Sequence, residues 1–353
     1  MGELQAYDRH MSSGSTSSLN DVAQAAGVSL ATASRALNGA YGVAASTRAR
    51  VLEAASELDY VASPEAQRLA GGTARRVALV VPHINRWFFG EMVSGIERVL
   101  SRANMDLLLY HVDGPEDRAR FLTRLPARRK VDAVIAVAFP VDAAEQKRLE
   151  LLGVQVVAAG GETADYPNVH IDDSAAGRQA VQHLLDLGHR RIAMIAGTDP
   201  HHPDWPDASG RSRAWHEALR DAGVAADGNL VRNITWVGTE AAAAMDSILD
   251  GCAERGEPMP TAVFAHSDEL AYGATQAIVR RGLRIPEDIS IVGIDDHPVS
   301  SFVDLTTVNQ QVALQGELAA QLLLDTLAGR PAQHETVVET SLVVRGSTAP
   351  PAR

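Results

Sequence analysis

The sequence predicts a small all-α helix-turn-helix headpiece followed by an α/β core of two doubly wound parallel-sheet lobes. Residues 18–60 show short helical patterns separated by turns, whereas 76–345 alternate apolar runs of strand length with amphipathic helical stretches. Continuous apolar runs between helices are typical of parallel sheets covered on both faces. The roughly 270 residues of the second region are too many for one such sheet, so two lobes are the simplest arrangement.

The helices of the headpiece carry recognisable start and turn signals. Ser18 is placed to cap a first helix, with Asp21 three residues later near its positive end. Gly27 permits the tight turn that follows, and Ser29 is placed to cap a second helix ending near Leu37. A third helix is expected over 46–58. A helix, a glycine-containing turn and a second helix form the helix-turn-helix layout.

This layout assigns the second helix to the major groove of DNA, with the side chains at its N-terminal end against the base edges. Arg35 is suited to read guanine through two parallel hydrogen bonds, and Leu30 and Ala31 offer apolar contacts. Short polar side chains are suited to hold phosphates. From the residues alone, a three-helix module that binds another protein remains open. The candidate DNA-contacting residues of the headpiece are Ser18, Asn20, Ser29, Leu30, Ala31, Thr32, Ser34, Arg35 and Asn38.

Composition limits the function classes of the chain. The formal net charge of −12 argues against nucleic-acid binding unless charge is segregated, and residues 18–76 are about balanced while the remainder is acidic. Cys252 is the only cysteine, which excludes an intrachain disulfide and a cysteine-based zinc site. Without an apolar leader or a membrane-length run, we expect a cytoplasmic protein with a disordered tail over 1–17.

Strand-length runs in the core lie at 77–81, 107–110, 131–137, 154–159, 192–195, 262–265 and 289–294. Open α/β sheets bind ligands at the carboxyl ends of their strands. After the first run come three consecutive aromatic residues in an aromatic-poor chain, and Trp87 and Phe88 are the candidates for a ligand cleft. Aromatic faces suit sugar rings, and Arg, Asp and Gln side chains suit hydroxyl groups.

The order D-V-A-x-x-A-G-V-S-x-x-T-x-S-R-x-L-N over 21–38 resembles the headpiece of the LacI–GalR family of bacterial regulators, and the similarity continues to about Arg345. The resemblance implies a homodimer that binds palindromic operator DNA and a periplasmic-binding-protein-like core that binds a small effector. It also implies a hinge helix in the connector, where Ser63, Pro64 and Gly71 provide a cap, a first position and a stop. Such hinge helices pair in the minor groove, with Leu69 as the wedge and Ala66 beside it. A flexible linker is the alternative.

The resemblance sets the domain boundaries and further effector-binding residues. The headpiece is expected over 18–61, the hinge helix and linker over 62–75, and the core over 76–349. The first lobe is expected over 76–172 plus 311–338, and the second over 173–310 plus 339–349. Arg178, Arg211, Trp236, Asp295 and Gln310 are assigned to the effector. Without the resemblance, a surface ion pair for each arginine and core packing for Trp236 remain open.

Two departures from the family pattern bear on the effector. Trp87 stands where related regulators often have proline, which favours a larger stacking surface for a disaccharide or glycoside. Ser267 stands where the family usually has asparagine, which puts a direct ligand contact there in doubt. In the loop 201–205, adjacent histidines splay apart, so we expect no metal there.

The resulting hypothesis is a repressor of carbohydrate-use genes whose operator affinity is set by a sugar. We expect no enzyme activity, because no catalytic set is recognisable, and no cofactor and no membrane contact. The alternatives are a corepressor-type regulator that responds to a purine or another metabolite, and a sugar-binding transport component. The missing export signal and the headpiece argue against the latter.

Overall fold

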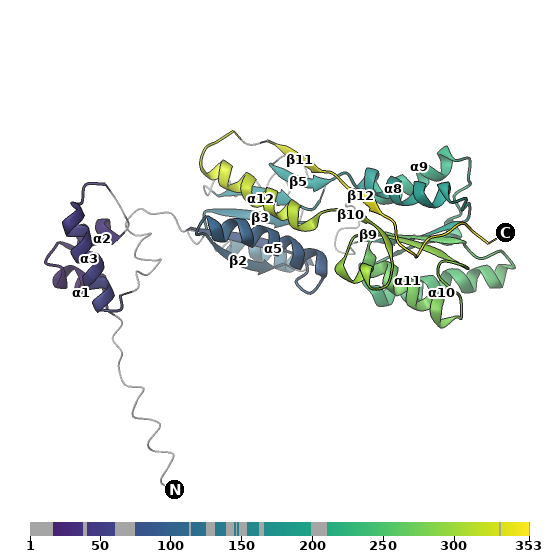
Figure 1. Ribbon diagram of the computed structural model, residues 1–353, viewed down its shortest axis with the longest axis horizontal. Coiled ribbons are helices and arrows are strands. Elements are labelled where there is room, and N and C mark those ends of the chain that lie inside the picture. The colour runs from purple at the N-terminus through teal and green to yellow at the C-terminus, as the bar shows by residue number, and fades with distance from the viewer. Residues whose placement is uncertain are drawn as a thin grey trace, which may run out of the picture. The chain divides into compact units, whose positions relative to one another are not determined.

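The computed structural model describes residues 17–37, 41–60, 75–112, 114–124, 131–138, 145, 147, 154–161, 166–198, 210–331 and 333–352. The chain divides into two compact units, Met1–Arg75 and Arg76–Arg353, whose elements are labelled in Figure 1. The predicted disordered tail, except Ser17, and the hinge helix lie outside the described residues, as does the 201–205 loop. No helix in the described ranges is long and apolar enough to cross a membrane.

In its described residues, the first unit is a bundle of three short helices. They are α1 (Leu19–Ala25), α2 (Leu30–Leu37) and α3 (Ala45–Glu57). Gly27 adopts a φ of 63° between α1 and α2, which confirms the predicted turn. The core is small because most of its buried side chains are alanine, which lets the helices approach closely. It consists of Val22, Ala23, Ala26, Ala33, Ala36, Val51, Ala54 and Ala55.

The first lobe of the second unit is a six-stranded parallel sheet in the order β11-β5-β4-β3-β1-β2. Its strands are β1 (Arg76–Val81), β2 (Asp106–His111), β3 (Ala133–Val137), β4 (Gln155–Ala159), β5 (Asn168–Ile171) and β11 (Glu335–Val338). The helices that the structure describes over their length are α5 (Trp87–Arg102), α6 (Gly114–Arg124) and α12 (Val312–Leu327). Alternate residues of β1 serve the two faces. Leu79 packs in the cluster that includes Met92 of α5, and Val80 packs in the cluster that includes Phe121 of α6.

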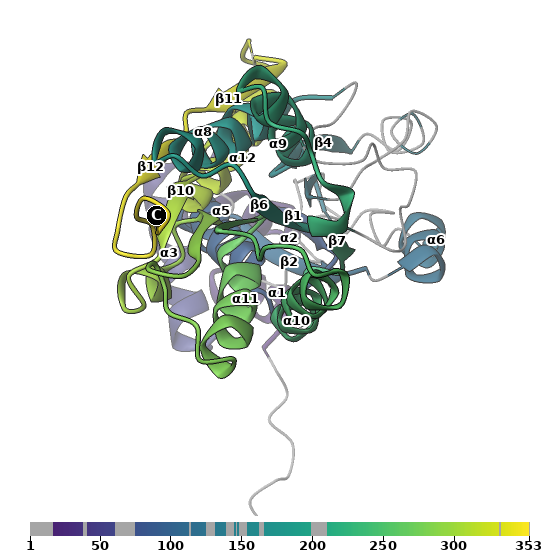
Figure 2. The same cartoon turned by 90° about the vertical axis from the view of Figure 1, so that its right-hand side faces the viewer.

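The second lobe is a six-stranded sheet in the order β12-β10-β9-β8-β6-β7. Its strands are β6 (Ile192–Gly197), β7 (Val231–Ile234), β8 (Ala262–Ala265), β9 (Ser290–Asp295), β10 (Thr306–Asn309) and β12 (Ser341–Val343). Its α-helices are α8 (Asp173–Asp186), α9 (Gly210–Asp221), α10 (Gly238–Arg255) and α11 (Asp268–Arg280), and its 3-10 helices are η2 (Gly228–Leu230) and η3 (Pro298–Ser301). Figure 2 shows α8 and α9 on one face of the sheet and α10 and α11 on the other. The parallel prediction holds for five strands, whereas β12 pairs antiparallel at the edge.

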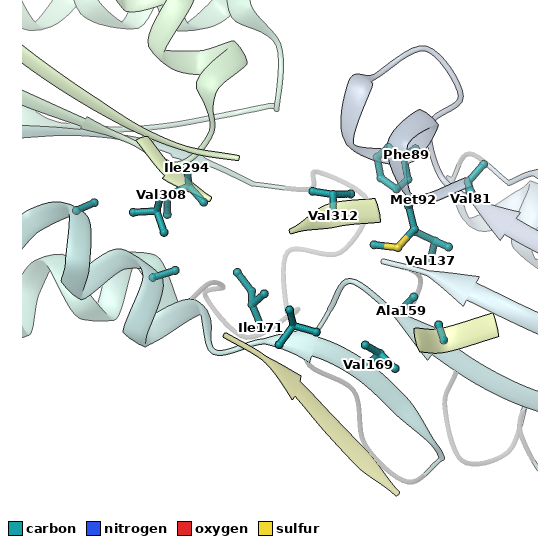
Figure 3. Packing of buried hydrophobic residues seen from close by; sticks show 14 of the residues in the cluster. Val81, Phe89, Met92, Val137, Ala159, Val169, Ile171, Ile294, Val308 and Val312 are labelled. Atoms are coloured by element: carbon teal, nitrogen blue, oxygen red, sulfur yellow. The ribbon is translucent and has the colours of Figure 1, made fainter. Parts of the chain in front are cut away.

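The chain passes between the two sheets three times, from β5 to α8, from β10 to α12, and from β11 to β12. One buried hydrophobic cluster contains side chains of both sheets, and Figure 3 shows Ile171 and Val312 beside these connections. Glycine allows α5 and α12 to meet in the first lobe, since a Cβ at Gly95 would lie 2.1 Å from the Ala313 carbonyl oxygen. Short segments thus join the two sheets. Residues that follow the carboxyl end of β1 contact residues that follow the carboxyl end of β9.

Candidate functional sites

The ends of the headpiece helices are fixed by side-chain caps. The Asp21 amide donates to Ser18 Oγ at 3.3 Å, and the Ser18 amide donates to Asp21 Oδ2 at 2.7 Å. The hydrogen bonds that the Ser18 amide and hydroxyl donate to the Asp21 carboxyl lower its pKa. The Thr32 amide donates to Ser29 Oγ at 3.2 Å. Both predicted caps are confirmed, and the second one sets where α2 begins.

The outer side of α2 is available for a partner. Ala33 and Ala36 are buried against the other two helices, whereas Leu30 is 51% exposed and Ala31 and Arg35 are exposed as well. The Arg35 Nε donates to the Ala31 carbonyl oxygen at 3.2 Å, so this guanidinium lies along its own helix. Among the other candidates, Ser18, Asn20 and Ser29 are exposed and Thr32 and Ser34 are half-buried, whereas Asn38, Ala66 and Leu69 lie outside the described residues.

A second group of polar and aromatic side chains gathers where the carboxyl ends of the two sheets meet. We call it the inter-lobe cluster. Arg86 and Trp87 of the first lobe follow β1, and the remaining members belong to the second lobe. The cluster consists of Arg86, Trp87, Asp173, Arg211, Trp236, His266, Glu269, Asp295, His297 and Gln310.

Arg211 is the most tightly held cation of the cluster. Its Nε donates to Asp173 Oδ1 at 2.6 Å, and its Nη1 donates to the His266 carbonyl oxygen. The guanidinium carbon lies 5.9 Å from the centre of the Trp236 ring. Burial, with the nearby Arg211 charge, holds the pKa of His266 well below its usual value, so this imidazole is neutral. Arg211 is therefore a pre-positioned donor rather than a surface side chain.

Asp295 ends β9 in a strained and buried position. Its φ is 146°, and its carboxyl accepts a hydrogen bond from Gln310 Nε2. Burial and the neighbouring charge of Asp268 raise the pKa of Asp295 to about 8. The carboxyl is therefore largely protonated at neutral pH and can both donate and accept. Backbone strain of this kind persists where the surroundings over-determine it, often at binding sites.

Two indole rings face the cluster from opposite lobes. Trp236 lies directly on Gly197 at the end of β6, where an added Cβ would be 2.3 Å from Trp236 Cδ2. Trp87 packs its ring against His297, with 4.8 Å between the ring centres. The structure thus brings together Trp87, Trp236, Arg211, Asp295 and Gln310 from among the residues assigned by sequence.

Two residues assigned to the effector are placed elsewhere. Arg178 is 46% exposed and forms ion pairs between α8 and α9, with Glu217 at 2.8 Å and Asp221 at 3.6 Å. These ion pairs direct the Arg178 side chain toward α9, and its ligand role stays a prediction. Phe88 packs within its own lobe, against Phe89 and beside Gly160. Its ring fills the space at the end of β4, so the structure does not group it with the inter-lobe cluster.

Sequence reasoning missed several residues that shape the site. Arg86 pairs with Glu269 across the lobes at 3.3 Å. Asp268 is buried and accepts hydrogen bonds from the Ser300 hydroxyl at 2.5 Å, the Thr307 hydroxyl at 2.6 Å and the His297 amide at 2.9 Å. Asp268 therefore fastens η3 and β10 to the start of α11. The sequence signal for Asp268 was a carboxylate shortly after the buried strand β8, at the start of a helix.

Ser267 has a structural role in the second lobe. It is buried, and its Oγ accepts from the Leu270 amide at 3.3 Å, which caps α11. The predicted departure from an asparagine at this position therefore leaves a helix cap in place.

Comparisons with known proteins find matches for both units of the chain. Residues 18–63 match the family described as bacterial regulatory proteins, lacI family, and residues 181–348 match the periplasmic binding protein-like domain. The HTH-type transcriptional repressor CytR of Escherichia coli strain K12 is 32% identical over 338 residues, which cover 94% of this chain and 96% of CytR. The chain belongs to the lacI family of bacterial regulatory proteins. It is a DNA-binding transcription regulator and not an enzyme.

Two solved structures of this family cover both units. The transcriptional regulator CelR in complex with cellobiose has a TM-score of 0.68 and 32% identity, covering 94% of this chain and 99% of CelR. The lac repressor dimer bound to operator and the anti-inducer ONPF has a TM-score of 0.80 and 27% identity, with the same coverage. The lacI-family headpiece with two α/β lobes is therefore the architecture of this chain.

Proposed function

We propose that this lacI-family protein is a homodimeric repressor of carbohydrate-use genes whose operator affinity is set by a sugar or glycoside held in the inter-lobe cluster. The observation that carries the proposal is the convergence of two indole rings with Arg211, Asp295 and Gln310 where the lobes meet. The related CelR was solved with cellobiose, which supports a sugar as the effector class.

The DNA-binding part of the proposal uses the exposed side of α2. Ser29, Leu30, Ala31, Thr32 and Arg35 enter the major groove, and Ser18, Asn20, Ser34 and Asn38 hold phosphates. One helix-turn-helix reads only a half-site, so two copies related by symmetry read a palindrome. The related lac repressor was solved as a dimer bound to operator. Ala66 and Leu69 are assigned to the minor groove, in a hinge over 62–75 that joins the headpiece over 18–61 to the core over 76–349. Because a repressor must reach its operator DNA, we propose a cytoplasmic location.

The inter-lobe cluster has the chemistry of a site for a neutral polyhydroxyl ligand. The indoles of Trp87 and Trp236 offer apolar faces for the C–H surfaces of a sugar ring. Arg211 donates, Gln310 both donates and accepts, and the protonated Asp295 carboxyl can do either. Asp295 and Gln310 are buried, so a sugar hydroxyl that hydrogen-bonds to them does not compete with bulk water for these side chains.

The inter-lobe cluster also links effector binding to the arrangement of the two lobes. Arg86 and Trp87 belong to the first lobe, whereas Trp236, Glu269 and His297 belong to the second. A sugar that contacts residues of both lobes stabilises one lobe arrangement by its differential affinity for that arrangement. We propose that this shift separates the hinge helices of the dimer and releases the operator.

A binding panel tests the effector assignment. The purified full-length protein is melted with glucose, galactose, xylose, arabinose, cellobiose, maltose, lactose and sucrose. At 100 times its dissociation constant, a binding sugar adds about 2.7 kcal/mol and raises the melting temperature of the core. The same sugar should weaken operator binding in a titration. A flat panel contradicts the sugar assignment, and a response to purines instead identifies the corepressor alternative.

A further inference from the structure

Arg86 connects the two lobes through its side chain. It directly precedes α5 in the first lobe, and its Nε donates to Glu269 Oε2 of α11 in the second lobe at 3.3 Å. Its guanidinium carbon lies 5.4 Å from the centre of the Trp236 ring and 5.9 Å from that of Phe89. A planar guanidinium is thereby held between an aromatic ring of each lobe, which restricts its orientation.

The outer edge of the Arg86 guanidinium is open. Only its Nε is used by Glu269, and its Nη1 and Nη2 atoms have no hydrogen-bond partner in the part of the chain that the structure describes. The side chain is 17% exposed, so it keeps contact with solvent. Arg211 differs, because both its Nε and its Nη1 are bound to Asp173 and the His266 carbonyl oxygen. Arg86 therefore offers a pair of parallel N–H donors that the fold itself does not occupy.

The charges around Arg86 decide which oxygens suit this edge. Glu269 already pairs with Arg86, and Asp173 already pairs with Arg211. Burial lowers the pKa of Arg86, while the charge of Glu269 raises it, which places this carboxylate within electrostatic reach. A carboxylate or phosphate ligand would bring another negative charge close to Glu269. Both arginines are already paired with carboxylates, so no unpaired cation would balance that charge. Neutral hydroxyl oxygens can accept from the open edge without that cost.

We propose that Arg86 is a further effector-binding residue, whose Nη1 and Nη2 donate to two adjacent hydroxyl oxygens of a neutral sugar. The proposal rests on the proposed function, because it assigns one more contact to the same effector. Since Arg86 comes from the first lobe and its partners Glu269 and Trp236 from the second, a sugar bound to Arg86 engages both lobes through one side chain. Arg86 thus selects neutral sugars over sugar acids.

Titration calorimetry on the full-length protein tests this assignment with the panel sugar that binds the wild type most tightly. Arg86→Met keeps an apolar stem between the rings but has no donors, and should weaken binding about 10- to 100-fold. Arg86→Lys keeps the charge without the planar fork and should also weaken binding by at least about tenfold. The control is Arg284→Met, which removes an arginine–carboxylate pair outside the cluster, with Asp288 at 2.9 Å, and should bind as the wild type does.

A hydroxyl-deletion cycle separates direct contact from a structural effect. Among monodeoxy analogues of that sugar, at least one should lose affinity for the wild type and lose little further affinity for Arg86→Met, because the contact is already gone. The uronic acid of the same sugar, oxidised at its primary alcohol, should bind the wild type more weakly than the parent. Deoxy losses that are equal in both proteins, or tighter binding of the uronic acid, overturn the proposal.

The failures of the two proposals are distinguishable. If no panel sugar binds the wild type, both the sugar assignment and the Arg86 contact fall. If a sugar binds the wild type and Arg86→Met or Arg86→Lys binds it equally well, only the paired-donor role of Arg86 falls. Thermal melts of each variant show whether it is folded before its affinity is compared.

Discussion

The headpiece and the inter-lobe cluster encode function in opposite ways. The exposed residues of α2 come from one continuous segment, Leu30–Leu37, and depend on a core made mostly of alanine. The inter-lobe cluster draws its residues from separate segments between Arg86 and Gln310, which lie near the ends of several strands and the starts of several helices. The contrast teaches that the surface proposed to read DNA is a local feature, whereas the surface proposed to bind the effector exists only in the assembled fold.

The largest expected effect is the unfolding of the headpiece, with the core left folded. Val22 is fully buried in the three-helix core, so Val22→Asp places an unpaired carboxylate there and should unfold the headpiece, at a cost of several kcal/mol. Because 76–353 forms its own compact unit, its melting transition and sugar binding should be unchanged. Calorimetry together with an operator titration checks this. A shift of the core transition would contradict the independence of the two regions.

The two regions should respond to pH with opposite signs. Asp295 has a raised folded pKa, so its contribution to core stability is fully present below its unfolded pKa near 3.8 and is lost as pH rises toward about 8. The loss approaches about 1.4 kcal/mol per pH unit inside that window. Asp21 has a lowered folded pKa, so its contribution to the headpiece is present above 3.8 and lost as pH falls.

Urea unfolding from pH 4 to pH 8 on the wild type and Asp295→Asn checks the pH assignment. The asparagine variant keeps the shape of the side chain without the titration, and its core should lose less stability across this range. Equal slopes in the two proteins would show that Asp295 does not titrate in the window assigned to it.

A close packing contact tests the Trp236 platform. Gly197→Ala puts a Cβ about 2.3 Å from the indole and should cost the core about 1–3 kcal/mol and weaken sugar binding, while operator binding by the unliganded protein persists. The control is Gly228→Ala, where no atom lies within 4 Å of the added Cβ and a change within about 0.5 kcal/mol is expected. Equal melting temperatures for the two variants would show that the Trp236 ring does not pack on Gly197.

The smallest expected effects come from removing one helix N-cap in each region. Ser18→Ala and Ser267→Ala each remove a side-chain N-cap and should each cost about 1 kcal/mol. The melting temperature should fall by about 4–8 °C for the small headpiece and by about 2–4 °C or less for the larger core. Differential scanning calorimetry resolves both transitions, and the reverse order of shifts would contradict the size difference between the two cooperative units.

Sequence reasoning succeeded where structure is local. The caps at Ser18 and Ser29 and the turn at Gly27 depend on neighbouring residues only, and the structure confirms all three. The third helix begins at Ala45 rather than at the expected 46, because its first turn has no side-chain cap to mark it. The buried strands were visible because both of their faces are covered, which leaves continuous apolar runs.

Sequence reasoning failed where the position of a strand or a side chain depends on residues that are distant in the sequence. β7 and β12 carry mixed polar residues at sheet edges, so their strand pairing depends on β6 and β10. Arg86 and Glu269 lie 183 residues apart, and only the assembled lobes show that they pair. Arg178 lies at a helix start as the family pattern suggests, but the nearest carboxylates on α9 decide its direction.

The measurement that tests the account most directly is selection of duplexes from a random library by the full-length protein, repeated with Arg35→Ala and with the best panel sugar. The account predicts that the wild type enriches a palindrome, that Arg35→Ala relaxes one position in each half-site, and that the sugar lowers recovery of the palindrome. A wild-type protein that enriches no palindromic duplex would contradict the account.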